Sequence, residues 1–369
     1  MTIPGRRPPR SGITTITCAW LAAVGTAVAA CTAPGQHGGL APHATAAPLT
    51  ARAAGAVGQP TSSPPTGVPR SASATRSAGR AGSFWTGERW LTLTEPAHTG
   101  PTGQALGPRK LLTEVLYPLA SEGKTAPAKG PLPMIVFGPG FMQCGGPYSR
   151  LLRYWASAGY VVVVVNFPLS DCKTGPAATE SDLVNQPHDM SYAITAMLAR
   201  SAAGHGFFAG LLSPREIAVT GQSDGGDTVA AMAASSCCTD RRPAAVAVLS
   251  GAEWPPMPGS YFSTRPAPML FTQGSADTVN WPGCSVTMYH SDPAWARYYL
   301  DLLGASHTGP YWGVNKYERV AARVTLAFFD RYVLRQSAAG PAMSRLGDVS
   351  GISALYEHGG GKLPSGPCN

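Results

Sequence analysis

The first 82 residues of this 369-residue chain lack lysine and acidic side chains, and residues 32 to 82 also lack aromatic ones. Without aromatic side chains, that segment has little with which to form a hydrophobic core. It consists mostly of alanine, glycine, proline, serine and threonine, a composition typical of disordered linkers. We therefore expect the folded part of the chain to begin near residue 83.

The net charge of +8 is concentrated in the same region. Seven of the 28 basic residues, all arginines, precede residue 83, which leaves 21 basic and 20 acidic residues for the rest of the chain. A folded part with so little net charge does not have the basic surface that a nucleic acid requires. We expect no nucleic-acid partner.

The N-terminus has the pattern of an export signal. Three arginines within the first ten residues precede an apolar run that extends to residue 30, as in a secretory signal peptide. The run ends in Val-Ala-Ala-Cys at residues 28 to 31, which resembles a bacterial lipobox. We expect residues 1 to 30 to be a signal peptide, and residues 31 to 82 to be a lipidated Cys31 followed by the linker. This predicts a lipoprotein anchored on the extracytoplasmic face of the cell membrane, with simple cleavage and secretion as the alternative.

Eight cysteines occur, of which Cys18 lies in the signal peptide. Six remain beyond Cys31, and an even number in an exported protein suggests disulfide bonds. No Cys-x-x-Cys spacing occurs and no histidine lies at ligand spacing from them, so we expect no metal site. The six candidates for disulfide bonds are Cys144, Cys172, Cys237, Cys238, Cys284 and Cys368.

We expect Cys144 to pair with Cys172, because both follow predicted strands in the same half of a sheet. The two adjacent cysteines cannot easily pair with each other, so we expect them to point toward Cys284 and Cys368.

Predicted strands alternate with helical patterns from residue 83 onward. Five successive valines at residues 161 to 165 are typical of a strand buried on both faces of a mostly parallel sheet. The alternation predicts an α/β fold with a mostly parallel sheet of about eight strands and helices on both faces. We expect this domain to span residues 83 to 340, with an antiparallel first pair of strands and a C-terminal tail at 341 to 369 that a disulfide could tether. The predicted strands are 89–94, 110–117, 131–138, 161–168, 216–220, 244–250, 267–274 and 297–304.

One strand leads directly into a helix through a glycine-rich turn. Residues 217 to 232 read "IAVTGQSDGGDTVAAM", in which Gly221 and Gly225 flank Ser223 as Gly-x-Ser-x-Gly. A serine at such a turn is crowded by the residues two positions away, which must be small. This pattern, with a strand before it and a helix after it, predicts that Ser223 is a nucleophile.

A serine hydroxyl needs a base, and in this arrangement the acid and then the base follow the serine along the chain. His307 follows the last predicted strand directly, in "DLLGASHTGPY", whereas His290 lies in a predicted helix and His358 in a glycine-rich tail. We therefore expect His307 to be the base.

The acid should also follow a strand. Asp277 comes three residues after Gly274 in "MLFTQGSADTVN", and Glu253, after the preceding strand, is the alternative. Asp292 and Asp301 are poorly placed, since one precedes the last strand and the other lies within it. We expect Asp277 to orient His307.

Acyl transfer also needs backbone N–H groups for the developing oxyanion, each worth about 3–4 kcal/mol. The N–H of Asp224, which follows the nucleophile, is one expected donor. The second is the N–H of Phe141, after the Gly-Pro-Gly loop at residues 138 to 140, and its ring offers a wall for substrate.

Residues 85 to 335 resemble the α/β-hydrolases, in particular dienelactone hydrolase, platelet-activating-factor acetylhydrolase and the cutinase-like polyester hydrolases. The resemblance implies serine-ester hydrolysis by Ser223, His307 and Asp277, with no metal or other cofactor. In the polyester hydrolases a tryptophan after the next strand lines the cleft, and Trp254 occupies a similar place. The elbow departs from the family in having Gln222 and Asp224. The matching segments are "RKLLTEVLYPLA", "IVFGPGF", "VTGQSDGG", "FTQGSADTV" and "GASHTG".

The sequence thus predicts an exported, monomeric serine hydrolase that acts on carboxylic esters. A non-catalytic binding lipoprotein that kept the fold is one alternative. An amidase or peptidase with the same triad is another, although the chain is too short for the propeller domain of an oligopeptidase.

Overall fold

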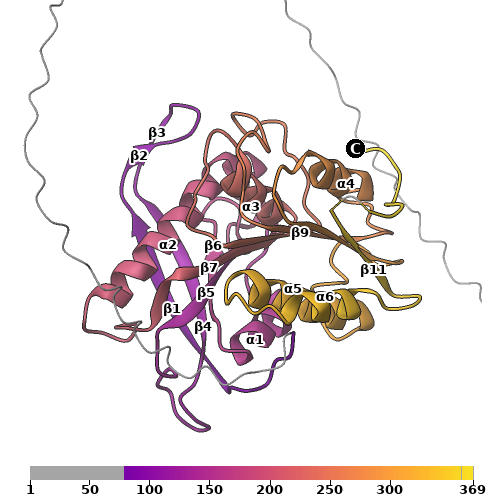
Figure 1. Ribbon diagram of the computed structural model, residues 1–369. Coiled ribbons are helices and arrows are strands. Elements are labelled where there is room, and N and C mark those ends of the chain that lie inside the picture. Colours follow the sequence, from indigo (N-terminus) through magenta and orange to yellow (C-terminus); the bar gives the residue numbers. More distant parts are fainter. Residues whose placement is uncertain (1–78, 359, 369) are drawn as a thin grey trace, which may run out of the picture. The chain divides into compact units, whose positions relative to one another are not determined.

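The computed structural model describes residues 79 to 358 and 360 to 368 (Figure 1). The predicted signal peptide, Cys31 and the linker as far as residue 78 lie outside the described residues. Within the described part, no helix is both long enough and apolar enough to cross a bilayer.

A nine-stranded sheet forms the centre of the described domain, in the order β1-β4-β6-β5-β7-β8-β9-β10-β11. Its six middle strands are parallel, while β1 and β4 pair antiparallel at one edge and β11 pairs antiparallel with β10 at the other. The α/β class, the mostly parallel sheet and the antiparallel first pair of strands are confirmed. The strands are β1 (Thr86–Glu95), β4 (Arg109–Pro118), β5 (Leu132–Gly138), β6 (Val161–Asn166), β7 (Leu212–Gln222), β8 (Ala245–Leu249), β9 (Met269–Gly274), β10 (Arg297–Leu302) and β11 (Ser353–Glu357).

Helices cover both faces of this sheet (Figure 1). Buried residues of α2, α3 and α4 share one hydrophobic core with one face, and those of α1, α5 and α6 share a second core with the other face. The valines of β6 alternate between the two cores and are all fully buried, and each contributes about 1.5–3 kcal/mol through burial. The helices are α1 (Ser149–Ser157), α2 (Gln186–Ala202), α3 (Asp224–Ala234), α4 (Pro282–Ser291), α5 (Lys316–Tyr332) and α6 (Ala339–Gly347).

Two smaller features lie outside these layers. A short hairpin of β2 (His98–Thr99) and β3 (Ala105–Leu106) connects β1 to β4. The C-terminal segment adds α6 and β11, regular structure that the sequence patterns do not indicate. The strand β11 is only five residues long, too short for a periodicity to be recognised.

Three disulfide bonds occur among the described residues. Cys144 pairs with Cys172, as predicted. The prediction that the adjacent cysteines reach toward the other two is wrong, because Cys237 pairs with Cys238 and Cys284 pairs with Cys368. The C-terminal segment packs so closely against Gly283 that a Cβ there would lie 2.3 Å from Gly366 O. This contact places Cys368 beside Cys284, with which it forms a disulfide bond. Cys237 and Cys238 then pair with each other.

Candidate active site

Ser223 lies at the sharp turn between β7 and α3, at the edge of the sheet where the parallel strands end. Its backbone has φ 57° and ψ −126°, a conformation that is strained for a residue with a side chain. Hydrogen bonds hold it there: the Ser223 N–H donates to Leu249 O at 2.9 Å, and Ser223 O accepts from the N–H groups of Gly226 and Asp227 at 2.6 and 3.0 Å.

Glycines make this turn possible, as the sequence predicts. A Cβ on Gly221 would lie 2.1 Å from Gly225 O, and a Cβ on Gly225 would lie 1.9 Å from Gly138 O. These distances are far inside van der Waals contact, so no larger residue fits without moving the backbone. The same close approach presses the loop after β5 against the turn, where a Cβ on Gly140 would lie 3.1 Å from the Ser223 Cβ.

His307 and Asp277 meet at the same edge of the sheet. Asp277 follows β9, His307 follows β10, and these strands are parallel neighbours that end side by side. The His307 Nδ1 lies 2.8 Å from Asp277 Oδ2, with the Asp277 side chain wholly buried and that of His307 12% exposed. Because a carboxylate only accepts, Nδ1 carries the proton, and the neutral ring presents a lone pair at Nε2.

Asp277 itself is held in place by further donors. Its Oδ1 accepts from the backbone N–H groups of Val279 and Asn280 at 2.9 and 3.1 Å, and its Oδ2 accepts from Gln273 Nε2 at 2.8 Å. The alternative acids do not contribute, since within the described residues no hydrogen bond or ion pair joins Glu253, Asp292 or Asp301 to His307.

Gln222, which the sequence patterns did not single out as a site residue, connects His307 to the loop after β5. Its Nε2 lies 3.1 Å from His307 Nε2 and 3.4 Å from His307 O. Its Oε1 accepts from the Tyr148 hydroxyl at 2.7 Å, and that hydroxyl accepts from the Gly140 N–H at 3.3 Å. The Gln222 amide thus donates to the lone pair that a serine proton would occupy, and across the described residues no hydrogen bond joins Ser223 to His307.

The only sequence signal for Gln222 was its departure from the residues common at that position in α/β-hydrolases. Tyr148 carried no signal, because it lies 74 residues before Gln222 and at the start of a helix-like segment.

Neither predicted oxyanion donor gives its N–H to another residue's backbone among the described residues, while the Asp224 N–H contacts its own carboxyl. Asp224 is the first residue of α3, so its N–H has no acceptor within the helix. The Phe141 N–H makes no hydrogen bond to any other described residue and follows Gly140, which contacts the turn. The loop and the helix end therefore leave two backbone donors beside Ser223.

Two acidic residues, Asp224 and Asp227, follow Ser223 in the first turn of α3. Asp224 is 6% exposed and its Oδ2 has no hydrogen-bond partner among the described residues. Burial, together with the charge of Glu180, raises the pKa of Asp224 to about 7. Asp227 is also buried, which raises its pKa, and its Oδ1 accepts from the Ala252 N–H at 2.6 Å.

Apolar side chains are exposed on the loops that carry these residues. Met142 follows the Phe141 donor, and Val279 and Trp281 follow Asp277; all three are exposed. Trp254, the predicted cleft residue, is half-buried and packs against a small cluster around Met257.

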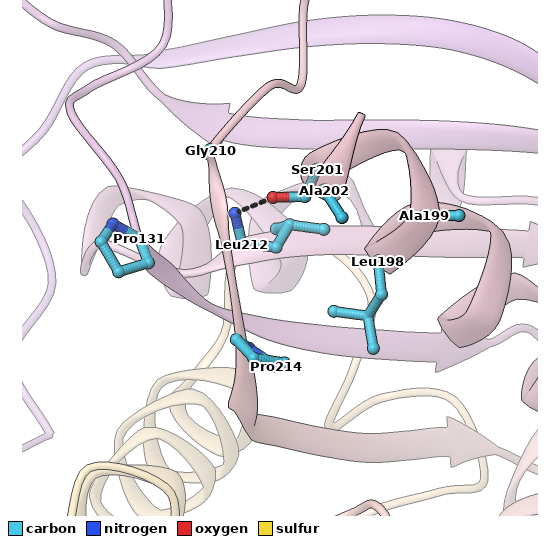
Figure 2. A pocket seen from close by; sticks show the side chains of 8 residues that line it. All are labelled: Pro131, Leu198, Ala199, Ser201, Ala202, Gly210, Leu212 and Pro214. Atoms are coloured by element: carbon cyan, nitrogen blue, oxygen red, sulfur yellow. Dashed lines mark hydrogen bonds between the residues drawn. The ribbon is translucent and has the colours of Figure 1, made fainter. Parts of the chain in front are cut away.

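An apolar pocket of about 550 Å³ lies away from this site (Figure 2). Leu212 is one of the residues that line it, and the Leu212 N–H donates to Ser201 Oγ at 2.8 Å. Leu212 begins β7 whereas Ser223 follows its end. The pocket therefore lies at the amino ends of the parallel strands, opposite to Ser223, and takes no part in the site. Its lining residues are Pro131, Leu198, Ala199, Ser201, Ala202, Gly210, Leu212 and Pro214.

No model of a known protein family matches the chain, and no curated protein matches it. The chemistry of the site is therefore inferred from its own geometry.

Proposed function

We propose that the protein is a serine hydrolase of the α/β-hydrolase class that cleaves carboxylic esters. The observation that carries the proposal is the Asp277–His307 pair, 2.8 Å apart, at the same edge of the sheet as the strained Ser223. A strained serine between strand and helix, followed along the chain by an acid and a histidine that are hydrogen-bonded to each other, is the arrangement of this class.

In the proposed reaction, the Ser223 hydroxyl attacks the ester carbonyl carbon and its proton passes to His307 Nε2. Asp277 keeps its charge and stabilises the imidazolium. The carbonyl oxygen becomes an oxyanion that accepts hydrogen bonds from the N–H groups of Phe141 and Asp224. The C–O bond then breaks, the departing alkoxide takes the proton from His307, and the acyl group remains on Ser223.

Water completes the cycle. It attacks the acyl-enzyme and gives one proton to His307, and the collapse of the second tetrahedral intermediate returns that proton to the Ser223 oxygen. Before each proton transfer to His307, the Gln222 amide must release the Nε2 lone pair. Catalytic hydrogen bonds are often long in the absence of substrate and shorten in the complex, which is consistent with a Ser223–His307 contact that forms on binding.

The exposed apolar residues on the site loops, Met142, Val279 and Trp281, favour an ester with an apolar acyl group over a charged substrate. An amidase using the same residues is the alternative, and a non-catalytic binding protein is a third possibility.

Turnover of p-nitrophenyl acetate and butyrate by the purified protein tests the proposal, with Ser223→Ala as the matched variant. We expect hydrolysis that Ser223→Ala abolishes, and a rate on the butyryl ester at least equal to that on the acetyl ester. A p-nitroanilide of the same acyl group tests the amidase alternative. Equal activity of the wild type and Ser223→Ala would refute the proposal, and no activity on any ester or anilide would favour the binding protein.

We also propose that the protein is exported and anchored through Cys31. Disulfide bonds persist in oxidising compartments, and the three of the described domain support export. Mass spectrometry of the mature N-terminus tests the anchor: a diacylglyceryl group on Cys31 is expected, whereas an unmodified N-terminus near residue 31 would indicate secretion.

A further inference from the structure

Glu95, His98 and His188 come together at the base of the β2–β3 hairpin, away from Ser223. Glu95 ends β1, His98 begins β2 and His188 lies in the first turn of α2. One potential ligand atom from each of the three lies within 4.8 Å of the others. The strand β1 is at the edge of the sheet, separated from β7 by three strands, so this cluster is distinct from the proposed active site.

The Glu95 carboxylate contacts few other side chains. Glu95 is only 1% exposed, and the partners of its carboxylate are the titratable side chains of His188, Asp189 and His98. Its contacts are ion pairs, 2.5 Å from Oε1 to His188 Nδ1 and 4.0 Å from Oε2 to His98 Nδ1. Burial of a carboxylate costs free energy, and a bound cation would reduce that cost.

His98 is oriented in the way that metal-ligating histidines usually are. Its Nδ1 lies 3.1 Å from Pro96 O, and because a carbonyl only accepts, Nδ1 carries the proton. The lone pair is then on Nε2, which is buried and has no partner among the described residues. Metal-ligating histidines commonly donate the other ring N–H to a backbone carbonyl in this manner.

An arginine and two aspartates lie next to the cluster. Across the β1–β4 pair, Glu95 lies opposite Arg109, whose guanidinium binds both Asp182 at 2.8 Å and Asp189 at 2.7 Å. Arg109 and the two aspartates therefore form a buried hydrogen-bonded network beside the cluster.

We propose that Glu95, His98 and His188 bind a divalent transition-metal cation of the zinc type, with His98 binding through Nε2. Two imidazoles and one carboxylate form a ligand set that suits zinc, with the fourth position left to water. Calcium and magnesium prefer oxygen ligands. The two imidazole rings are stacked, with centroids 4.2 Å apart, and the half-exposed His188 has room to turn toward the cation. The bound cation would fix the hairpin to α2.

No sequence pattern indicates this site. Glu95 and His98 are three residues apart in an extended segment and His188 follows 90 residues later, so the three form no recognisable spacing.

Calorimetric titration of the purified protein, without a histidine tag, with Zn²⁺ at pH 7.5 tests the proposal. We expect saturable binding of one ion per chain, and a visible absorption band of four- or five-coordinate Co²⁺ when Co²⁺ replaces Zn²⁺. Loss of an outer-sphere partner already weakens metal binding by about 10- to 100-fold, so His98→Ala and His188→Ala should each weaken it by at least about 100-fold. The exposed His205, in the turn after α2, provides the control, since His205→Ala should bind as the wild type does.

Affinity should also fall as the pH is lowered from 7.5 to 5.5, because a ligating imidazole must be deprotonated and protons compete with the metal for it. No binding by the wild type, or equal binding by the wild type and His188→Ala, would overturn the proposal. His188→Ala carries the decisive comparison because the side chain is half-exposed and its loss leaves the core intact. The esterase activity plays no part in this test, so the result is independent of the proposed function.

Discussion

Replacement of Asp277 by asparagine tests the role of the carboxylate while keeping its shape. The Asp277 oxygens accept four hydrogen bonds, from His307 Nδ1, Gln273 Nε2 and two backbone N–H groups. An asparagine has one oxygen and one NH2 group. If its oxygen keeps the two backbone donors, its NH2 faces His307 Nδ1, which must then give up its proton and accept.

The imidazole proton would consequently move to Nε2, where the Ser223 proton has to be received. In a serine protease the same substitution lowers kcat about 10⁴-fold through the wrong tautomer, which corresponds to about 5.4 kcal/mol of transition-state stabilisation. We expect a fall of about 10³- to 10⁴-fold in kcat on p-nitrophenyl butyrate, with KM changed by less than about 5-fold because the side chain does not touch substrate.

Asp301→Asn is the matched control. Asp301 is also buried, 4% exposed, in the neighbouring strand β10, and no hydrogen bond joins it to His307 in the described structure. Its replacement should leave kcat within about 2-fold of the wild type. Thermal unfolding of both variants should confirm that each is folded at the assay temperature. A folded Asp277→Asn with kcat within 10-fold of the wild type would refute the assigned role of Asp277.

Four further substitutions probe the elbow and its contact with Tyr148. Because burial raises the pKa of Asp224 to about 7, this carboxyl is neutral below that pH and becomes negative above it, on the residue that follows Ser223. The kcat/KM of the wild type should therefore fall as the pH rises above 7, and a pH–rate profile of Asp224→Asn, which keeps the backbone N–H, should lack that fall. Gln222→Leu should raise kcat/KM by about 2- to 13-fold, since a hydrogen bond of about 0.5–1.5 kcal/mol to His307 no longer has to be broken, whereas Tyr148→Phe should only lower the melting temperature. A lower kcat/KM in folded Gln222→Leu would instead mean that Gln222 positions His307. Gly225→Ala places a Cβ 1.9 Å from Gly138 O and should yield insoluble protein or, if soluble, protein with at least about 100-fold lower kcat/KM.

The sequence allowed the sheet and its parallel direction to be predicted because strand and helix patterns alternate strongly, above all in the valines of β6. The strain at Ser223 followed from the spacing of Gly221 and Gly225. The proximity of Asp277 and His307 followed from a simple rule, since each comes directly after a parallel strand and such strands end at one edge. Sequence patterns were sufficient where a feature depends on residues close in the chain or on the common direction of neighbouring parallel strands.

The features that were missed depend on contacts between distant segments. The pairing of Cys284 with Cys368 depends on the packing of the C-terminal segment against Gly283. The Tyr148–Gln222–His307 chain joins three segments that no periodicity links. The Glu95–His98–His188 cluster likewise requires a hairpin to be placed beside a helix.

Covalent labelling of the nucleophile tests the central claim most directly. A fluorophosphonate reacts with a serine only where a base activates it and N–H groups stabilise the phosphonyl oxygen. After reaction of the purified protein, peptide mass spectrometry should find one phosphonyl group on Ser223, with labelling absent in Ser223→Ala and much slower in Asp277→Asn. An unlabelled Ser223 in folded protein, or a label on another residue that Ser223→Ala retains, would contradict the account.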